Sequence, residues 1–454
     1  MAKNITKDMT TGSPLRLILS FAVPLLLGNL FQQVYGMADT VIVGRFLGKE
    51  ALAAVGATVA LSGLVLGFAI GVSAGFAVLV ASLFGAKSYD RMRNCTANIF
   101  YLASGITVLM TVTAVILTRP MLEWMNTPAD IIDLSYDYLV IVFAGIFAPM
   151  LYNVLAYMLR ALGDSKTPLY FLIVSSLLNV ALDLLFVAAI PMGVAGAALA
   201  TVLAQAISAI CCLVYTYKKM PELRLGRKDM RPNISLSGRL LYLGIPMAFQ
   251  FSVTAIGAII LQSAVNGLGS DVVASVSSSS TVQLFAFFPL ESIGLTLTTY
   301  CSQNLGAGRY DRIRKGIRMG LLLALVCSVI GGVIIFVLGD RIALLFFDAS
   351  EQAVIDNVKH FLRIGTLFYP VLALLFVYRN SVQGLGSSMV AMSGGIIEMI
   401  TRSAVALLLV PVWQFNAACV AQPISWIPVV LTMIPAFYII LHRMEKTNKS
   451  EIKE

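Results

Sequence analysis

The segment Gly85-Ala86-Lys87-Ser88-Tyr89-Asp90-Arg91 returns later in the chain as Gly306-Ala307-Gly308-Arg309-Tyr310-Asp311-Arg312. The two copies are 221 residues apart, and Pro149 and Pro370 keep the same separation. A short motif copied alone would not keep this register, so we interpret the chain as two repeated halves of about 220 residues. An internal repeat in a very apolar chain is typical of secondary transporters built from two helical bundles.

The composition predicts a membrane protein. Of the 454 residues, 58% are hydrophobic and 12% are charged, whereas soluble domains carry about 25% charged residues. The six cysteines have no disulfide or metal-binding spacing, only two histidines are present, and the sequence contains no HExxH, GxSxG or P-loop motif. We therefore expect neither an enzyme nor an ATP-driven pump, and we expect no cofactor.

Twelve apolar stretches are long enough to cross a bilayer, which requires about 20 residues each. These stretches are predicted to begin near Leu15, Ala51, Arg91, Asp130, Lys166, Met192, Ser235, Asp271, Tyr310, Gln352, Ser388 and Asn416. The predicted fold is an all-α integral membrane protein with twelve transmembrane helices in two six-helix bundles. Six is an even number, so both halves should enter the membrane from the same side, related by a pseudo-two-fold axis along the membrane normal.

Charge sets the expected orientation and the domain boundaries. Lysine and arginine residues cluster in the even-numbered connections and in the polar stretch at mid-chain, which predicts that these connections and both termini are cytoplasmic in a multi-pass plasma-membrane protein. The net charge of +9 then reflects topology, and no nucleic-acid partner is expected. The predicted parts are an N-terminal segment (1–13), an N-lobe (14–217), a cytoplasmic linker (218–234), a C-lobe (235–442) and a cytoplasmic tail (443–454).

Two acids of the first half lie inside apolar spans without a basic neighbour. At 1.5 Å per residue, Asp39 and Asp183 lie about 10 Å and about 9 Å from the outer ends of their helices, and Thr201 reaches a similar depth. Tyr35 and Asn179 lie one turn from these acids on the same helix faces. The sequence therefore predicts a cation-coupling site for a proton or a sodium ion, and Na+ would use the oxygens of the four residues other than Tyr35. The alternative is that each acid bonds a neighbouring carbonyl and serves packing.

The second half differs at the matching positions. Glu398 and Arg402 are four residues apart on one helix and can neutralise each other, which favours a structural role for the pair. Glu291 stands alone in its segment, and it either lines a central cavity or bonds a neighbouring helix. We regard all three as candidate residues of a cavity in the C-lobe.

Prolines predict bends. Pro24 removes the helical hydrogen bond to the carbonyl of Ser20 and should bend the first helix, so we predict it as a hinge. Pro246, Pro149 and Pro370 should act similarly in their own helices.

These motifs together resemble the multidrug and toxic compound extrusion (MATE) family, in its bacterial branch, over about residues 14–442. The motifs are Ala38-Asp39-Thr40-Val41-Ile42-Val43-Gly44-Arg45, the doubled Gly-Ala-x-x-Tyr-Asp-Arg, Gln303-Asn304-Leu305, Arg160-Ala161-Leu162-Gly163-Asp164 with Thr167-Pro168, and Gly193-Val194-Ala195-Gly196-Ala197-Ala198-Leu199-Ala200-Thr201. The resemblance implies a V-shaped pair of six-helix bundles that exports drugs or metabolites in exchange for H+ or Na+.

The resemblance also implies where the cation binds. In DinF-like members the site lies in the N-bundle, on residues that match Tyr35, Asp39, Asn179, Asp183 and Thr201. In NorM-like members carboxylates of the C-bundle are implicated instead. Glu291 and Glu398 match those carboxylates only loosely, and the nearby Arg402 departs from that pattern.

The leading hypothesis is an antiporter that exports small amphipathic organic cations by alternating access and works as a monomer in the bilayer. A lipid-linked oligosaccharide flippase of the same superfamily is the nearest alternative, and it would need a more cationic cavity to hold pyrophosphate. Inside the spans we find few basic residues, Arg402 and Arg379 among them. A channel or signalling membrane protein is the alternative from another class.

Overall fold

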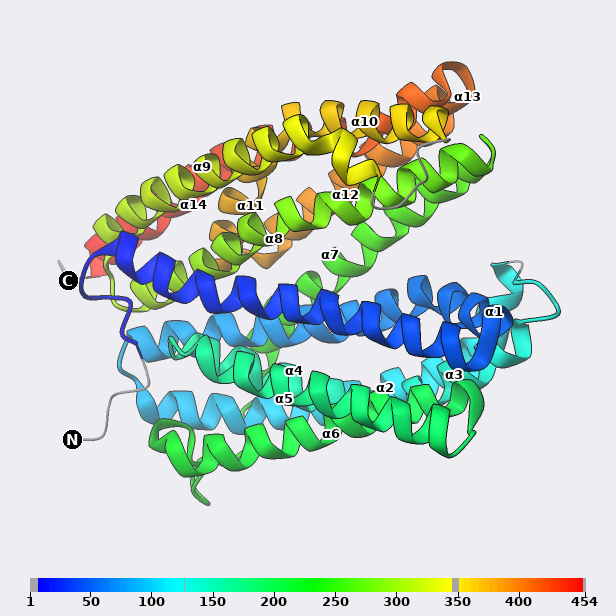
Figure 1. Cartoon of the computed structure of the whole chain (residues 1–454). Coiled ribbons are helices and arrows are strands. Elements are labelled where there is room, and N and C mark those ends of the chain that lie inside the picture. The colour runs from blue at the N-terminus through cyan, green and yellow to red at the C-terminus, as the bar shows by residue number, and fades with distance from the viewer. Residues whose placement is uncertain (1–6, 126, 345–350, 452–454) are drawn as a thin grey trace. The chain divides into compact units, whose positions relative to one another are not determined.

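The computed structural model describes residues 7–125, 127–344 and 351–451, and their regular secondary structure is helical throughout. The first half contains α1 (Pro14–Gly85), α2 (Tyr89–Trp124), α3 (Ile132–Ala144), α4 (Phe147–Ala161), α5 (Lys166–Asp183), the π-helical segment η1 (Leu184–Ala189), α6 (Gly193–Lys219) and the short η2 (Pro221–Leu223) (Figure 1). The second half contains α7 (Ile234–Asn266), α8 (Ser270–Gly306), α9 (Tyr310–Ala343), α10 (Gln352–Leu367), α11 (Tyr369–Gly384), α12 (Ser388–Ala404), the π-helical η3 (Val405–Leu409), α13 (Val410–Trp413) and α14 (Phe415–Glu451).

The described residues contain the twelve predicted spans. Nine helices are long and apolar enough to cross a membrane, and the bent pairs α3–α4 and α10–α11 raise the number to eleven. The helix α1 adds the twelfth because Gly48, with φ 85° and ψ −175°, breaks it into spans over residues 14–47 and 49–85. Glycine adopts a positive φ without steric cost, which explains the break at this position. Each predicted span begins within two residues of its observed start.

The repeat extends to irregular features of the backbone. The bend between α3 and α4 is 48° and the bend between α10 and α11 is 51°. Pro149 and Pro370 lie just after these two bends, in the first turn of α4 and of α11. The π-helical segments η1 and η3 begin at Leu184 and Val405, again 221 residues apart. Both halves therefore inherited the same broken helices.

The structure divides into two compact units. Unit 1 contains residues 27–252 and unit 2 contains residues 253–451. The start of the chain is shared, since residues 7–8 belong to unit 1 and residues 9–26 to unit 2. These units differ from the predicted lobes, because the start of α1 packs in unit 2, and the linker and the first half of α7 pack in unit 1. Residues 1–6 and 452–454 of the predicted terminal segments lie outside the described residues.

Apolar packing explains this exchange of helix ends. Ile18 and Ala22 of α1 are buried in a cluster with Leu290 and Leu297 of α8. Residues from the first half of α7 are buried in a cluster with the second span of α1, and they are Leu236, Leu240, Leu243, Met247 and Ala248. Each of these helix ends therefore buries its apolar face in the other unit.

Small residues bring α7 close to the second span of α1. A Cβ atom at Gly71 would lie 2.5 Å from Cα of Ala248, and one at Gly75 would lie 2.5 Å from Cα of Gly244. Glycines spaced by four residues form such a close contact surface between membrane helices. This contact, inside unit 1, holds the first half of α7.

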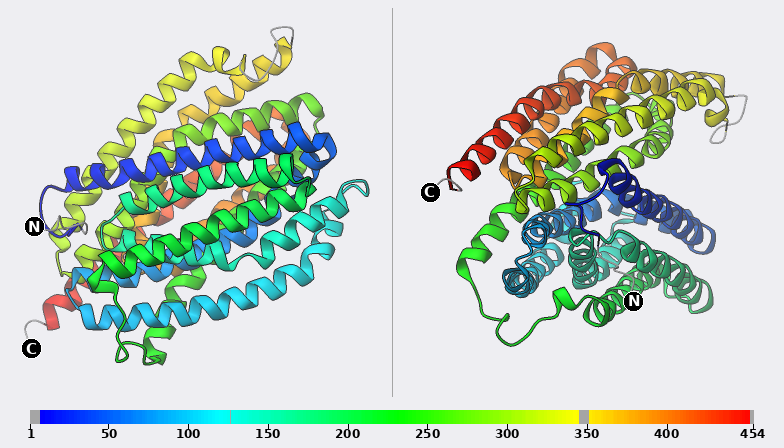
Figure 2. Two further views of the ribbon diagram at one scale, coloured as in Figure 1. Left: turned by 60° about the horizontal axis from the view of Figure 1, so that its bottom comes forward. Right: turned by 90° about the vertical axis from the view of Figure 1, so that its left-hand side faces the viewer.

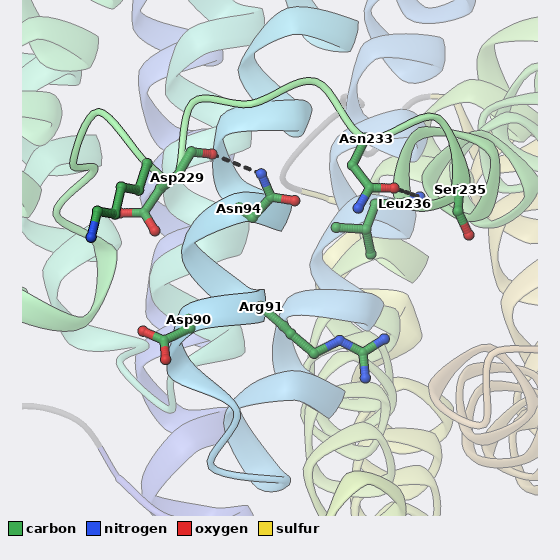
Figure 3. Close-up of a pocket in the computed structure, with 8 residues that line it drawn as sticks. Asp90, Arg91, Asn94, Asp229, Asn233, Ser235 and Leu236 are labelled. Carbon is green, nitrogen blue, oxygen red and sulfur yellow. Dashed lines mark hydrogen bonds between the residues drawn. The ribbon is translucent and has the colours of Figure 1, made fainter.

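Polar side chains dock the linker on α2 (Figure 3). Asn94 Nδ2 donates to the carbonyl oxygens of Asp229 and Arg231, at 2.8 Å each. The amide of Asn233 donates to Asn98 Oδ1 at 2.9 Å. The linker between α6 and α7 is thus bound to unit 1 along its backbone.

A similar socket in unit 2 holds the start of the chain. The amide of Met9 donates to Gln303 Oε1 at 2.9 Å, and Asn304 Nδ2 donates to the Met9 carbonyl at 3.2 Å. Arg312 Nη1 donates to the carbonyl of Gly12 at 3.0 Å. The Gln303-Asn304 motif and the second Gly-Ala-x-x-Tyr-Asp-Arg copy therefore bind the segment that precedes α1.

Candidate functional site

The two predicted acids of unit 1 meet at one place, which we call the acid site. Asp39 lies on the first span of α1, and Asp183 is the last residue of α5 before η1. Their carboxyl groups interact directly with each other. Two ionised carboxylates are both acceptors and cannot bond each other. Accordingly Asp39 Oδ1 and both carboxylate oxygens of Asp183 are buried without a hydrogen-bond partner.

Asn179 and Thr201 join the acid site from neighbouring helices. The helices α5 and α6 pack side by side (Figures 1 and 2), and Asn179 Nδ2 donates to Thr201 Oγ1 at 3.3 Å. Asn179 lies one turn before Asp183 on α5, and its Oδ1 is buried without a partner. Its amide group therefore presents a further acceptor oxygen beside the acids.

Two tyrosines lie within electrostatic reach of both acids. Tyr35 lies one turn before Asp39 on α1, as the sequence predicts, and Tyr138 comes from α3. The sequence prediction did not include Tyr138. The depth of Tyr138 in the membrane could have identified it from the sequence. At 1.5 Å per residue it lies about 9 Å from the start of α3, the same depth as expected for Asp183.

The acid site lacks donors. Among the described residues, it contains four buried acceptor oxygens without a partner, on Asp39, Asn179 and Asp183. No lysine, arginine or histidine of the described chain forms an ion pair with either acid. Buried polar groups are almost always satisfied, so this geometry fits a proton on a carboxyl group or a cation that prefers hard oxygen ligands. The π-helical segment η1 follows Asp183 directly, and such segments occur frequently at functional sites.

The candidate residues of the second half belong to a different kind of site. Arg402 Nη2 lies 2.5 Å from Glu398 Oε1, so the expected ion pair is present. A second arginine that the prediction did not pair with it, Arg379 of α11, lies 3.2 Å from Glu398 Oε2. Glu291 interacts electrostatically with Arg379 of the neighbouring helix α11. Whether these residues line a cavity stays a prediction.

Pro24 lies inside α1 without interrupting the helix, close to where the chain passes from unit 2 to unit 1 between residues 26 and 27. Its role as a hinge stays a prediction.

A pocket of about 360 Å³ lies between α2 and the linker (Figure 3), and its lining includes none of the predicted site residues. Its two acids, Asp90 and Asp229, are both paired with Arg93. We therefore regard it as part of the linker contact.

Comparison with known proteins identifies the family to which the chain belongs. A model of the MatE family matches residues 24–185 and 246–408, which cover most of both halves. The chain belongs to the MatE family. The two matched segments also coincide with the two copies of the repeat.

Bacterial relatives in this family extend over most of the chain. It is 30% identical to the probable multidrug resistance protein YoeA of Bacillus subtilis over 360 residues, 78% of each chain. It is 27% identical to the probable multidrug resistance protein NorM of Thermotoga maritima, over 88% of this chain and 86% of the relative. An outward-facing multidrug resistance MATE transporter of known structure shares the fold with a TM-score of 0.90 at 19% identity, covering 98% of this chain and 100% of that one.

Family membership tests the predictions from the sequence. The twelve-span, two-unit helical fold is confirmed. The family also confirms that the chain is a multi-pass membrane transporter of small compounds. It is a multidrug exporter and not an enzyme, as predicted.

Proposed function

We propose that this MatE protein exports small amphipathic organic cations across the plasma membrane, in exchange for H+ or Na+ bound at the acid site of unit 1. The observation that carries the proposal is the set of four buried, unpartnered acceptor oxygens around Asp39 and Asp183. The multidrug resistance names of the bacterial relatives support the export of drug-like compounds. We propose that the protein acts as a monomer with both termini in the cytoplasm, and that the coupling ion is its only cofactor.

The chemistry of the acid site suggests how coupling works. Two facing carboxylates without a counter-ion repel each other in a dry environment, and a bound cation removes this repulsion. Asn179 and Thr201 would complete an oxygen ligand set for Na+, whereas a proton would reside on one carboxyl group. A cation gradient drives export if cation and substrate occupy the transporter alternately, so a cation that loads the acid site from outside would favour release of the substrate there and the return to the inward-facing state.

Reconstituted transport tests the proposal. Purified protein in proteoliposomes receives an imposed pH gradient or an imposed Na+ gradient, and the movement of a fluorescent organic cation is followed. We expect Asp39→Asn or Asp183→Asn to reduce gradient-driven transport to the rate seen without a gradient. Wild-type transport by both variants would refute the assignment of the site.

Asp164→Asn is the matched control. Asp164 is also a buried acid of unit 1, but its Oδ1 accepts from the amides of Lys166 and Thr167 at 3.0 Å each, at the start of α5. Asparagine keeps this acceptor, so the control variant should transport normally. Equal loss in all three variants would show a general effect on stability instead of a coupling role.

A further inference from the structure

The pocket between α2 and the linker, which we call the linker pocket, contains basic side chains that no acid pairs with. Arg91 and Lys228 line it together with polar side chains of α2, the linker and α7. Both are exposed, and neither forms an ion pair with another described residue. The two acids of the pocket, Asp90 and Asp229, share Arg93 as their partner, and Figure 3 shows Arg91 and Asp90 pointing in opposite directions.

The chain around the linker pocket is positively charged. Residues 90–94 and 226–239 together carry a net charge of +4, and the exposed basic residues outside the pocket are Arg227, Arg231 and Arg239. The pocket lies at the starts of α2 and α7, and both helices qualify as membrane spans. It is therefore close to the level of the lipid headgroups, where basic clusters at the ends of spans attract acidic lipids.

Large apolar side chains are exposed beside these basic ones. Ile234, the first residue of α7, is 90% exposed, and Met230 of the linker is 49% exposed. Tyr101 of α2 is exposed as well, and its hydroxyl donates to the carbonyl of Met230 at 2.9 Å. Exposed apolar and basic side chains side by side are typical of a segment that lies in the membrane interface. A soluble phosphate would use only the cations and leave the apolar side chains in water.

We infer that the linker pocket binds the headgroup phosphate of an anionic phospholipid, whose acyl chains contact the exposed apolar side chains beside the pocket. Arg91 and Lys228 would pair with the phosphate through charge-assisted hydrogen bonds. Asn233 Oδ1 accepts from the amide of Leu236 at 3.1 Å, which leaves the NH2 group of Asn233 to donate to the same phosphate.

A bound lipid would hold the linker on α2 from outside the protein. The direct bonds between the two are few, and two of them come from Asn94 to backbone carbonyls of the linker. A phosphate that contacts Arg91 of α2 and Lys228 of the linker at once would add a bridge between the same two elements. This role goes beyond the proposed export function and does not depend on the acid site.

Direct lipid binding tests the inference. Purified, delipidated protein in detergent receives phosphatidylglycerol or phosphatidylcholine with the same acyl chains, and the bound lipid is counted by native mass spectrometry. We expect the wild type to bind phosphatidylglycerol about tenfold or more tightly than phosphatidylcholine. Arg91→Gln combined with Lys228→Gln should weaken binding of phosphatidylglycerol about tenfold or more and change binding of phosphatidylcholine less than about twofold. Equal affinity of the wild type for both lipids would overturn the inference.

Lys315→Gln combined with Arg318→Gln is the matched control. It removes the same charge from exposed residues near the start of α9, the repeat counterpart of α2. This variant should change the affinity for phosphatidylglycerol less than about twofold. Equal loss in both double variants would show general attraction by surface charge and would overturn the assignment of the pocket.

Hydrogen–deuterium exchange locates the bound lipid. Phosphatidylglycerol should slow exchange of the amides in residues 226–234 of the wild type, and it should not do so when Arg91 and Lys228 are both replaced by glutamine. If that double variant does not fold, Lys228→Gln alone, at an exposed linker residue, decides the question in the same two assays. Exchange in the linker that does not respond to phosphatidylglycerol in the wild type would refute the proposed site.

Two further measurements separate a lipid from a soluble phosphate. Ile234→Ser should weaken binding of both lipids by a similar factor, because it removes an apolar contact and no charge. Glycerol 3-phosphate, which lacks acyl chains, should displace phosphatidylglycerol only at about a hundredfold excess or more. Displacement at equal concentration, or unchanged lipid binding by Ile234→Ser, would indicate a site for soluble phosphate and overturn the lipid assignment. Asp39→Asn should bind phosphatidylglycerol like the wild type, so failure here leaves the coupling site untouched.

Discussion

The close contact between α7 and the second span of α1 predicts an unusual sensitivity to a single methyl group. A Cβ atom at Gly71 would lie 2.5 Å from Cα of Ala248 and 2.6 Å from the carbonyl oxygen of Met247. Non-bonded carbon atoms prefer about 3.5–4.0 Å, so Gly71→Ala must separate the two backbones by about 1 Å. Overpacking of this kind costs about 1–3 kcal/mol of unfolding free energy.

Gly63→Ala on the same helix is the matched control. No atom lies within 4 Å of a Cβ at Gly63, so this variant should gain only the helix preference of alanine, about 0.5–1 kcal/mol. Gly71→Ala gains the same preference, and the difference between the two variants therefore isolates the packing cost. The unfolding free energy of each purified variant in detergent is the quantity to compare.

The double variant sharpens the test. Gly75→Ala requires the same separation of helices, because its Cβ would lie 2.5 Å from Cα of Gly244. Once the helices have moved for one alanine, the second should cost little more, so Gly71→Ala with Gly75→Ala should be clearly less destabilising than the sum of the singles. If Gly71→Ala is as stable as Gly63→Ala within about 0.5 kcal/mol, the reasoning from backbone contact is wrong.

Three further perturbations follow from the polar contacts. Glu398→Gln leaves two buried arginines without their shared carboxylate and should lower the unfolding free energy by about 3–5 kcal/mol, measured by denaturation in detergent; an effect below about 1 kcal/mol would contradict this. Tyr138→Phe keeps the ring but removes a hydroxyl near both acids, so it should raise the cation concentration that half-saturates transport, whereas an unchanged value would exclude Tyr138 from the acid site. Asn304→Ala removes a donor to the Met9 carbonyl and should lower the unfolding free energy by about 0.5–1.5 kcal/mol. In this variant a cysteine placed at position 9 should react faster with a thiol reagent. Unchanged labelling would show that this socket does not hold the start of the chain.

The two halves are alike in backbone and differ in the polar groups that the backbone carries. Both keep a bent helix pair followed by a proline, and both keep a π-helical segment at the same register. At the acid site of unit 1 this frame holds acceptor oxygens that lack donors, and around Glu398 of unit 2 it holds the Nε donors of Arg379 and Arg402, which lack acceptors. The duplicated frame is thus shared, whereas the buried polar groups that it carries differ between the two halves.

Local patterns were enough to predict the spans and most members of the acid site. The number and starts of the helices follow from hydropathy, because transfer of an apolar segment into lipid depends mainly on its own residues. Tyr35 and Asn179 could be assigned to the acids because helical periodicity places residues four apart on one face. The repeat itself could be recognised in the sequence because matching residues of the two copies keep the same separation.

Contacts between distant segments had no such local signal. The meeting of Asp39 with Asp183, the approach of Tyr138, and the second arginine on Glu398 all depend on which helices pack together. The exchange of helix ends between the units was equally hidden, because the burial of Ile18 and the close approach at Gly71 arise from shape complementarity with residues far along the chain. An apolar sequence predicts that a helix enters lipid. Which helix it packs against depends on shape complementarity and on the pairing of the few polar groups that lipid cannot satisfy.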